Sequence, residues 1–136
     1  IRGILSEEGV SLEERKDFIP RREPVPRIRA AVEKRDYAHV GRLIAADKRY
    51  SKIVCRCENI TEAEVVAAVR KGHVTLDGIK FSARAGTGRC QGGFCTSRIM
   101  EIISREAGIP VERISKKGAG SEILRIRTKV AHQDRI

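Results

Sequence analysis

The chain has 136 residues, no Trp and a formal net charge of +10 at pH 7. This length allows one domain with extensions, and the core must be built from Ile, Val, Leu and Ala because only 4% of the residues are aromatic. No apolar run approaches the roughly 18 residues of a membrane span, and no signal peptide is visible. The composition therefore argues against a transmembrane segment, and we expect a cytoplasmic protein.

Residues 1–30 are predicted to form a proline-containing arm. Ser11 and Glu14 can close one helical turn as a capping box, and three prolines between positions 20 and 26 then favour extended backbone. The arm also carries apolar side chains that a solvated linker does not need. Because the chain starts at Ile1 and not at Met, we expect it to have been cut from a larger protein or to lack its start, with the arm lying against another surface.

Residues 31–50 are predicted to be a helical lead-in, within a periodic stretch that runs from about residue 29 to residue 46. Apolar side chains recur at helical spacing on one face of this stretch. They are Tyr37, Val40, Leu43 and Ile44.

A helix with clear ends is predicted from residue 61. Thr61 and Glu64 have the capping-box spacing at its start, and Gly72 closes it as a left-handed cap. Residues 75–84 are ambiguous, because their apolar side chains fit both an alternating strand and a short helix.

A second helix and a tail follow. An apolar stripe predicts a helix that ends at Gly108, and its members are Ile99, Ile102, Ile103 and Ala107. A single turn is predicted over residues 111–114. Residues 118–136 are predicted to be a flexible tail, in which apolar and basic side chains alternate from Leu124 to Val130 as in a short edge strand.

All four cysteines of the chain lie in two tight pairs, Cys55 with Cys57 and Cys90 with Cys95. A folded domain can bring both pairs onto one site, where four thiolates suit either a 2Fe-2S cluster or a structural zinc ion. Disulfides are disfavoured, because a bridge between Cys55 and Cys57 would be strained and nothing marks the chain as exported. We therefore predict that all four cysteines bind a metal cofactor, and we assign no catalytic residue.

The surroundings of the cysteines favour iron–sulfur over zinc. Cys57 shortly precedes the Thr61 cap and Cys95 starts the second helix, so two helix N-termini would face an anionic cluster. Zinc sites usually pair cysteines two residues apart, unlike the spacings here. Glycines would let backbone amides reach the sulfur atoms, and adjacent arginines would favour reduction. The residues predicted to surround the ligands are Arg56, Gly88, Arg89, Gly92 and Gly93.

The high positive charge raises nucleic acid as a partner. The basic residues are spread along the chain, however, and no basic block is interleaved with aromatic residues for base stacking. A basic surface that docks on an acidic partner domain is the simpler explanation. Nucleic-acid binding is therefore disfavoured, since the charge is its only support.

The residues around the cysteines resemble a known family. Residues 53–58 (IVCRCE) and 61–64 (TEAE) resemble the bacterioferritin-associated-ferredoxin-like (BFD-like) 2Fe-2S domain. Within that group, residues 76–80 (LDGIK), 84–95 (RAGTGRCQGGFC) and 117–121 (KGAGS) look like the C-terminal domain of anaerobic-type, FAD-dependent glycerol-3-phosphate dehydrogenases. Four residues separate Cys90 from Cys95. This gap differs from the two-residue gap of the small free-standing ferredoxin and agrees with the flavoenzyme branch.

The resemblance implies a mainly α fold, a small helix–turn–helix iron–sulfur domain over residues 51–117 in which the four cysteines hold the cluster. It favours a helix at residues 75–84. It also implies an electron-transfer module of an oxidoreductase, which relays electrons one at a time from FAD to a respiratory acceptor through a membrane-associated subunit. FAD would be bound outside this chain, which has no dinucleotide-binding glycine motif. The arm at residues 1–30 would link this chain to the catalytic domain, which is not in it. The protein would then be cytoplasmic or peripheral to the inner face of the membrane. A free-standing ferredoxin-like module and a zinc-stapled regulatory module remain the alternatives.

Overall fold

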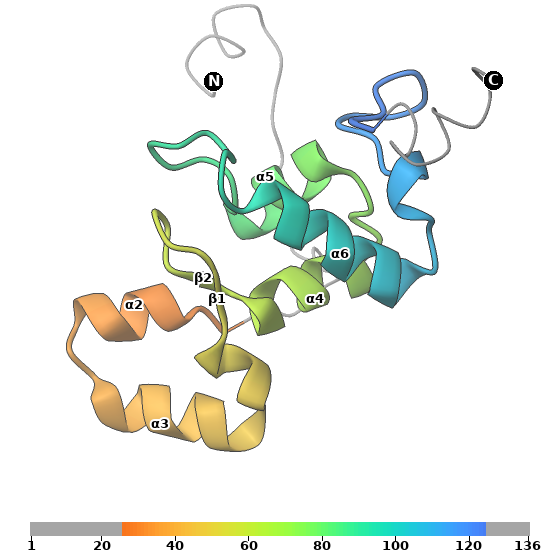
Figure 1. Cartoon of the computed structure of the whole chain (residues 1–136). Helices are drawn as coiled ribbons and strands as arrows, with labels where there is room; N and C mark the ends of the chain where they lie inside the picture. The colour runs from red at the N-terminus through yellow and green to blue at the C-terminus, as the bar shows by residue number, and fades with distance from the viewer. Residues whose placement is uncertain (1–25, 125–136) are drawn as a thin grey trace, which may run out of the picture.

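The structure, a computed structural model, describes residues 26–124 (Figure 1). In this part the helices are α2 (Ile28–Glu33), α3 (Tyr37–Ala46), α4 (Glu62–Arg70), α5 (Leu76–Ala83) and α6 (Thr96–Ala107), the 3-10 turns are η1 (Lys48–Ser51) and η2 (Val111–Arg113), and the strands are β1 (Ile53–Cys55) and β2 (Ile60–Thr61). The mainly α fold is as predicted. None of the helices described is long and apolar enough to cross a membrane.

The main core lies between α4, α5 and α6, which Figure 1 shows gathered on one side of the molecule. Its fully buried side chains are aliphatic, as the composition predicts. They include Ile60, Val65, Val66, Ile79, Ile102, Ile103 and Ile114. Cys55 and Cys95 belong to the same cluster and are each 1% exposed. Two of the four thiols are therefore fixed by the core itself.

A smaller apolar cluster joins the lead-in to the rest of the fold. Ile28, Tyr50 and Ala63 form its buried part, and the partly buried side chains of α3 pack against it. Those side chains are Val40, Leu43 and Ile44. This cluster connects α2 and α3 to the start of α4, close to the first cysteine segment.

The periodicity over residues 29–46 corresponds to two helices and not to one. Arg35 has a positive φ of 55°, which interrupts the first helix. Asp36 then caps α3 by accepting a hydrogen bond from the His39 amide at 2.9 Å. Of the four apolar residues expected on one helical face, Val40, Leu43 and Ile44 pack against the smaller cluster. Tyr37 does not, since it is 68% exposed at the first turn of α3.

The capping box at the start of α4 is confirmed. The amide of Thr61 donates to Glu64 Oε2 at 2.8 Å, and the Thr61 hydroxyl donates to the same oxygen at 2.7 Å. Gly72 follows α4 with a φ of 91°, as a left-handed cap requires. Glu64 is only 4% exposed, and its Oε1 atom has no hydrogen-bond partner in the part of the chain described.

The buried Glu64 should make the stability of the fold depend on pH. Burial raises the pKa of this carboxyl above its ordinary value of 4.5, although the Thr61 amide and hydroxyl oppose the rise. A raised pKa stabilises the fold below the unfolded-state pKa, and this contribution is lost as the pH rises through the folded-state pKa. We expect Glu64→Gln, which cannot ionise, to lose less free energy of unfolding than the wild type between about pH 5 and about pH 8.

Urea unfolding at both pH values measures this difference. Glu101→Gln is the matched control, because its carboxyl lies on the exposed face of α6 and its side chain is 59% exposed. Equal pH slopes for the wild type and Glu64→Gln would contradict the prediction.

The ambiguous segment forms the helix α5, as the family resemblance favours. Thr75 caps it by accepting a hydrogen bond from the Gly78 amide at 3.1 Å. Ile79 is fully buried, while Phe81 is 83% exposed. The alternation of apolar residues that fitted a strand was therefore misleading, because Phe81 belongs to a helix and points to solvent.

The second helix begins and ends as predicted. Cys95 is the N-cap of α6, and Gly108 ends the helix in the left-handed conformation with a φ of 67°. The single turn predicted over residues 111–114 corresponds to the 3-10 turn η2. Most of the predicted arm and of the predicted edge strand (residues 1–25 and 125–136) lies outside the residues described.

Candidate metal centre

The first cysteine segment is a tight antiparallel hairpin. Cys55 ends β1 and pairs with Ile60 of β2, and Ile53 pairs with Thr61 across an irregular register. Cys57 lies in the connecting turn and is exposed. Asn59 reverses the chain with a positive φ of 52°.

Glu58 attaches this hairpin to its neighbours. Its carboxylate pairs with Arg29 of α2 and, at 3.5 Å, with Arg84 at the end of α5. The residue beside Cys57 is thus held by two elements outside the hairpin.

The second cysteine segment is the glycine-rich loop between α5 and α6. Successive turns are closed by hydrogen bonds from the Gln91 amide to the Gly88 carbonyl and from the Gly93 amide to the Cys90 carbonyl, each at 2.9 Å. The Thr96 hydroxyl donates to the Gly92 carbonyl at 2.6 Å. This loop carries Cys90 and ends on Cys95 at the first turn of α6.

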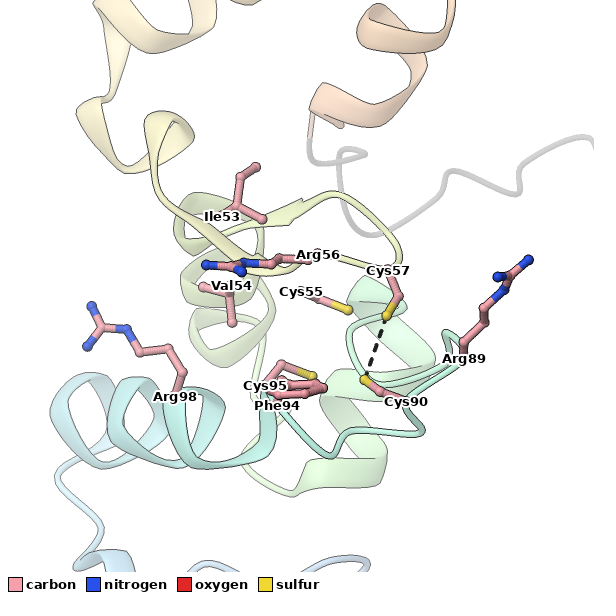
Figure 2. A pocket seen from close by; sticks show the side chains of 10 residues that line it. All are labelled: Ile53, Val54, Cys55, Arg56, Cys57, Arg89, Cys90, Phe94, Cys95 and Arg98. Carbon is pink, nitrogen blue, oxygen red and sulfur yellow. Dashed lines mark hydrogen bonds between the residues drawn. The ribbon is translucent and has the colours of Figure 1, made fainter.

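The structure brings the four cysteines together at one cavity of about 740 Å³. Figure 2 shows Cys55 and Cys57 on one side of it and Cys90 and Cys95 on the other, with their sulfur atoms facing the same space. All four are free thiols. The cavity is lined by Ile53, Val54, Cys55, Arg56, Cys57, Arg89, Cys90, Phe94, Cys95 and Arg98.

The four thiols form two neighbouring pairs, and each pair takes one cysteine from the hairpin and one from the glycine-rich loop. The sulfur atoms of Cys57 and Cys90 are 3.7 Å apart, and the buried Cys95 lies beside Cys55. Two sulfur ligands of one tetrahedral metal ion, at about 2.3 Å from it, lie about 3.8 Å apart. The Cys57–Cys90 separation therefore suits two ligands of one ion. Nowhere in residues 26–124 do three acidic, His or Cys side chains converge on a single metal position.

The two groups of thiols differ in electrostatic environment. Backbone amides of Phe94 and Gly92, together with the Cys57 thiol, hold the pKa of Cys90 below its ordinary value. Burial, with the neighbouring Cys55, raises the pKa of Cys95 to about 12. A bound metal cation would offset the cost of the buried thiolate. Both groups of thiols therefore fit a metal cofactor. Backbone amides stabilise the thiolate of Cys90 in the first group, and the second group, Cys55 and Cys95, is buried in the core.

The predicted glycines lie against the cysteines. A Cβ atom on Gly88 would stand 2.2 Å from the Cβ atom of Cys57, so only glycine fits there. Gly92 has a φ of 90°, and a Cβ atom on it would lie 2.8 Å from the Thr96 hydroxyl. A Cβ atom on Gly93 would come within 3.2 Å of the Cys90 carbonyl. These three positions let the loop pass close to the thiols.

The charged surroundings differ in part from the prediction. Arg56 and Arg89 do line the cavity, but Figure 2 shows their guanidinium groups directed away from the sulfur atoms. At the start of α4 the Thr61 and Glu62 amides are already bonded, to Glu64 and to the Lys52 carbonyl. The amides of the N-cap and of the first residue of α4 are therefore not available to the cysteines. Helix α6, in contrast, has Cys95 itself as its N-cap.

Several cavity residues were not foreseen from the sequence. Phe94 and Ile53 expose apolar surface at the mouth of the cavity, and Arg98 approaches it from the first turn of α6. The signal for Arg98 was its place three residues after Cys95, one helical turn along α6.

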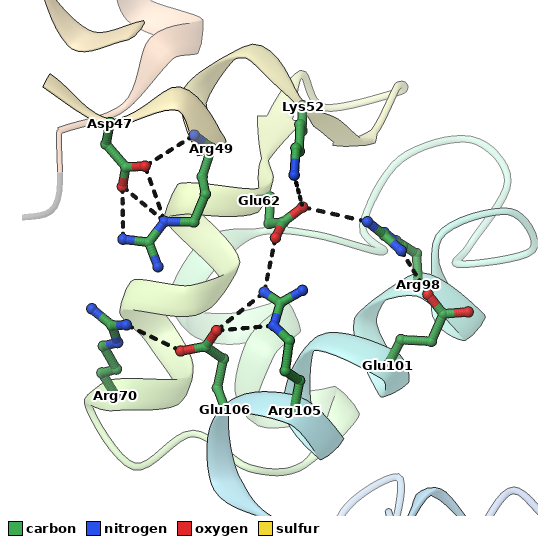
Figure 3. A network of polar contacts seen from close by, with 9 residues as sticks. All are labelled: Asp47, Arg49, Lys52, Glu62, Arg70, Arg98, Glu101, Arg105 and Glu106. Atoms are coloured by element: carbon green, nitrogen blue, oxygen red, sulfur yellow. Dashed lines mark hydrogen bonds and ion pairs between the residues drawn. The ribbon is translucent and has the colours of Figure 1, made fainter. Parts of the chain in front are cut away.

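A network of charges holds α4 and α6 together beside the site (Figure 3). Glu62 is 2% exposed, and its carboxylate accepts from Arg105 at 2.8 Å and from Arg98 at 3.4 Å. Lys52, which comes just before β1, lies 3.8 Å from the same carboxylate. Since these cations come from the approach to β1 and from α6, Glu62 helps to keep the two cysteine segments together.

Comparison with known proteins supports an iron–sulfur site. Residues 53–105 match the family model of the BFD-like 2Fe-2S binding domain. The chain is 41% identical over 128 residues to a glycerol 3-phosphate dehydrogenase of Caloramator mitchellensis, an alignment that covers 93% of this chain and 26% of that protein. It is 32% identical over 99 residues to the hydrogen cyanide synthase subunit HcnB of Pseudomonas aeruginosa, covering 70% of this chain and 21% of that protein.

A third relative is an opine oxidase subunit of Agrobacterium tumefaciens, 34% identical over 77 residues that cover 57% of this chain and 14% of that protein. The chain spans about a quarter or less of the length of these three relatives. No solved structure matches it significantly. The matched residues 53–105 include all four cysteines, and the resemblance read from the sequence is confirmed: this chain carries a BFD-like 2Fe-2S binding domain and is related to glycerol-3-phosphate dehydrogenase subunits.

Proposed function

We propose that the chain is the electron-transfer module of a FAD-dependent glycerol-3-phosphate dehydrogenase, with a 2Fe-2S cluster held by its four cysteines. The observation that carries this proposal is the convergence of Cys55, Cys57, Cys90 and Cys95 in two cross-segment pairs at one cavity. A cluster of two metal ions needs two thiolates for each ion, which this arrangement supplies. The cluster would supply one-electron chemistry.

The protein's own residues position and stabilise the site. Cys55 and Cys95 anchor one side of it in the aliphatic core, where water is excluded. The amides of Gly92 and Phe94 donate toward Cys90 on the other side, which stabilises negative charge at that sulfur. Exposure of Cys57 leaves this second side accessible from solvent. One side thus fixes the site while the other lies open to a redox partner.

The remaining part of the enzyme would hold FAD and the substrate. The alignment with the Caloramator mitchellensis glycerol 3-phosphate dehydrogenase covers most of this chain but about a quarter of that protein, which leaves ample length for a flavin domain. We propose that substrate oxidation reduces FAD by two electrons, and that the electrons then leave singly through this module. The final acceptor would be respiratory and reached through a membrane-associated subunit.

The first experiment is an absorption spectrum of anaerobically purified protein, with iron and acid-labile sulfide measured on the same sample. We expect broad visible bands that bleach with dithionite, and about two irons and two sulfides per chain. A colourless protein that holds one zinc ion even after anaerobic reconstitution would overturn the proposal.

The relay itself needs the whole enzyme. Glycerol 3-phosphate added anaerobically, without an acceptor, should bleach both the flavin and the cluster bands. If only the flavin bands respond while the cluster is present and reducible by dithionite, the relay is wrong although the cluster assignment stands.

A further inference from the structure

Exposed apolar side chains stand at the mouth of the cysteine cavity. Phe94 is 86% exposed and Ile53 is 47% exposed, and both line the cavity. Phe94 directly precedes the buried Cys95, so a molecule that touches its ring comes close to the thiols. Covering this ring would remove apolar surface from water and favour association.

The same mouth is basic. Arg56, Arg89 and Arg98 are the charged side chains that line the cavity. Arg98 is paired with Glu62 and Glu101. Arg56 and Arg89 are exposed and form no salt bridge with any residue in the 26–124 range. Two of the cations that line the cavity with Phe94 thus have no anionic partner in the described part of the chain.

These features match one kind of interface. Electron-transfer encounters use small contact areas and depend on electrostatic steering between opposite charges. An obligate interface between two subunits would be larger and more apolar. One aromatic ring with two unpaired arginines therefore fits a transient partner whose surface is acidic.

We propose that the Phe94 face, formed by Ile53, Arg56, Arg89 and Phe94, is the docking site for a separate, acidic electron-acceptor protein. Carboxylates of that protein would pair with Arg56 and Arg89, and an apolar contact would cover the Phe94 ring. The electron then leaves through the mouth of the cavity that these four residues line. This inference rests on the electron-transfer function proposed above.

The test uses the acidic soluble domain of cytochrome b5 as the probe. The dithionite-reduced protein is mixed with it, and cluster reoxidation is followed by stopped-flow absorption. We expect the second-order rate constant to fall as salt is added, and to fall about tenfold in the Arg56→Gln, Arg89→Gln double variant. Phe94→Ala should lower it about fivefold, and Phe94→Leu should restore part of the loss.

Two matched controls separate the face from general surface effects. Phe81→Ala removes a ring that is 83% exposed on α5 and does not line the cavity, and Arg42→Gln removes an exposed cation on α3. Both should react at the wild-type rate. With basic cytochrome c as oxidant, the double variant should be no slower than the wild type.

Cluster content, measured first in each variant, distinguishes the two proposals. A protein that binds no cluster would overturn the proposed function and this inference with it. A protein that binds a reducible cluster, but reacts with cytochrome b5 at a rate independent of Phe94 and of both arginines, would overturn the docking face alone. Slower reduction by the substrate in the whole enzyme, with unchanged reoxidation, would place the flavin domain on this face and also overturn it.

Discussion

Each single Cys→Ser replacement is expected to abolish the cluster. Every thiolate is one of two that would hold a given metal ion, and a serine hydroxyl is a poor substitute for a thiolate with iron. Iron, labile sulfide and visible absorption should therefore fall to near zero after anaerobic reconstitution of Cys57→Ser and of Cys95→Ser. Ser97→Ala, an exposed change in the first turn of α6, should keep full occupancy.

The two sides of the site should differ once the cofactor is absent. Cys95 is 1% exposed in the core, so a serine there places a hydroxyl among apolar side chains, at a cost of about 1–3 kcal/mol in the apoprotein. Cys57 is exposed, and its replacement should change the free energy of unfolding of the apoprotein little. Urea unfolding of the metal-free variants measures both. A variant that retains two irons and two sulfides would remove that cysteine from the ligand set.

The ends of the helices could be predicted from the sequence because each depends on a few neighbouring residues. The pairing of Thr61 with Glu64 requires only a spacing of three residues, and Gly108 needs only a local left-handed conformation. The break before α3 depends equally on local groups, but it requires a positive φ at Arg35. That conformation is uncommon outside glycine, so the continuous apolar periodicity hid it.

The partnering of the thiols could not be predicted from spacing. The pairs along the chain are Cys55 with Cys57 and Cys90 with Cys95, whereas the neighbours in space are Cys57 with Cys90 and Cys55 with Cys95. Adjacent side chains in β1 and its turn point in different directions, and the packing of both cysteine segments into the core around α4 decides which thiols meet. The burial of Glu62 has the same origin, since its cationic partners come from elements distant in sequence.

The cross-segment pairing has a consequence for stability. A metal ion held by Cys57 and Cys90 would join the β1–β2 hairpin to the glycine-rich loop, and one held by Cys55 and Cys95 would join β1 to α6. Cofactor binding would then add to the free energy of unfolding, because the unfolded chain cannot present the four thiolates together. The site therefore depends on how closely the two segments can approach.

Gly88→Ala is expected to prevent that approach. The added methyl group would stand 2.2 Å from the Cys57 Cβ atom and 3.4 Å from its sulfur atom, a contact that neither segment can accommodate in place. The hairpin and the loop must move apart, which separates Cys57 from Cys90. Overpacking of this kind costs about 1–3 kcal/mol, and we expect it to appear as a loss of bound iron and of visible absorption.

Two glycine variants provide the controls for this prediction. Gly86→Ala introduces strain at a φ of 91°, but its nearest atom is 4.0 Å away, so it should cost about 1–2 kcal/mol of unfolding free energy and keep the cluster. Gly41→Ala meets nothing within 4 Å and lies inside α3, so it should stabilise the fold by about 0.5–1 kcal/mol. Full cluster occupancy in Gly88→Ala would contradict the steric argument, because the thiols would then meet without the close approach of the two segments.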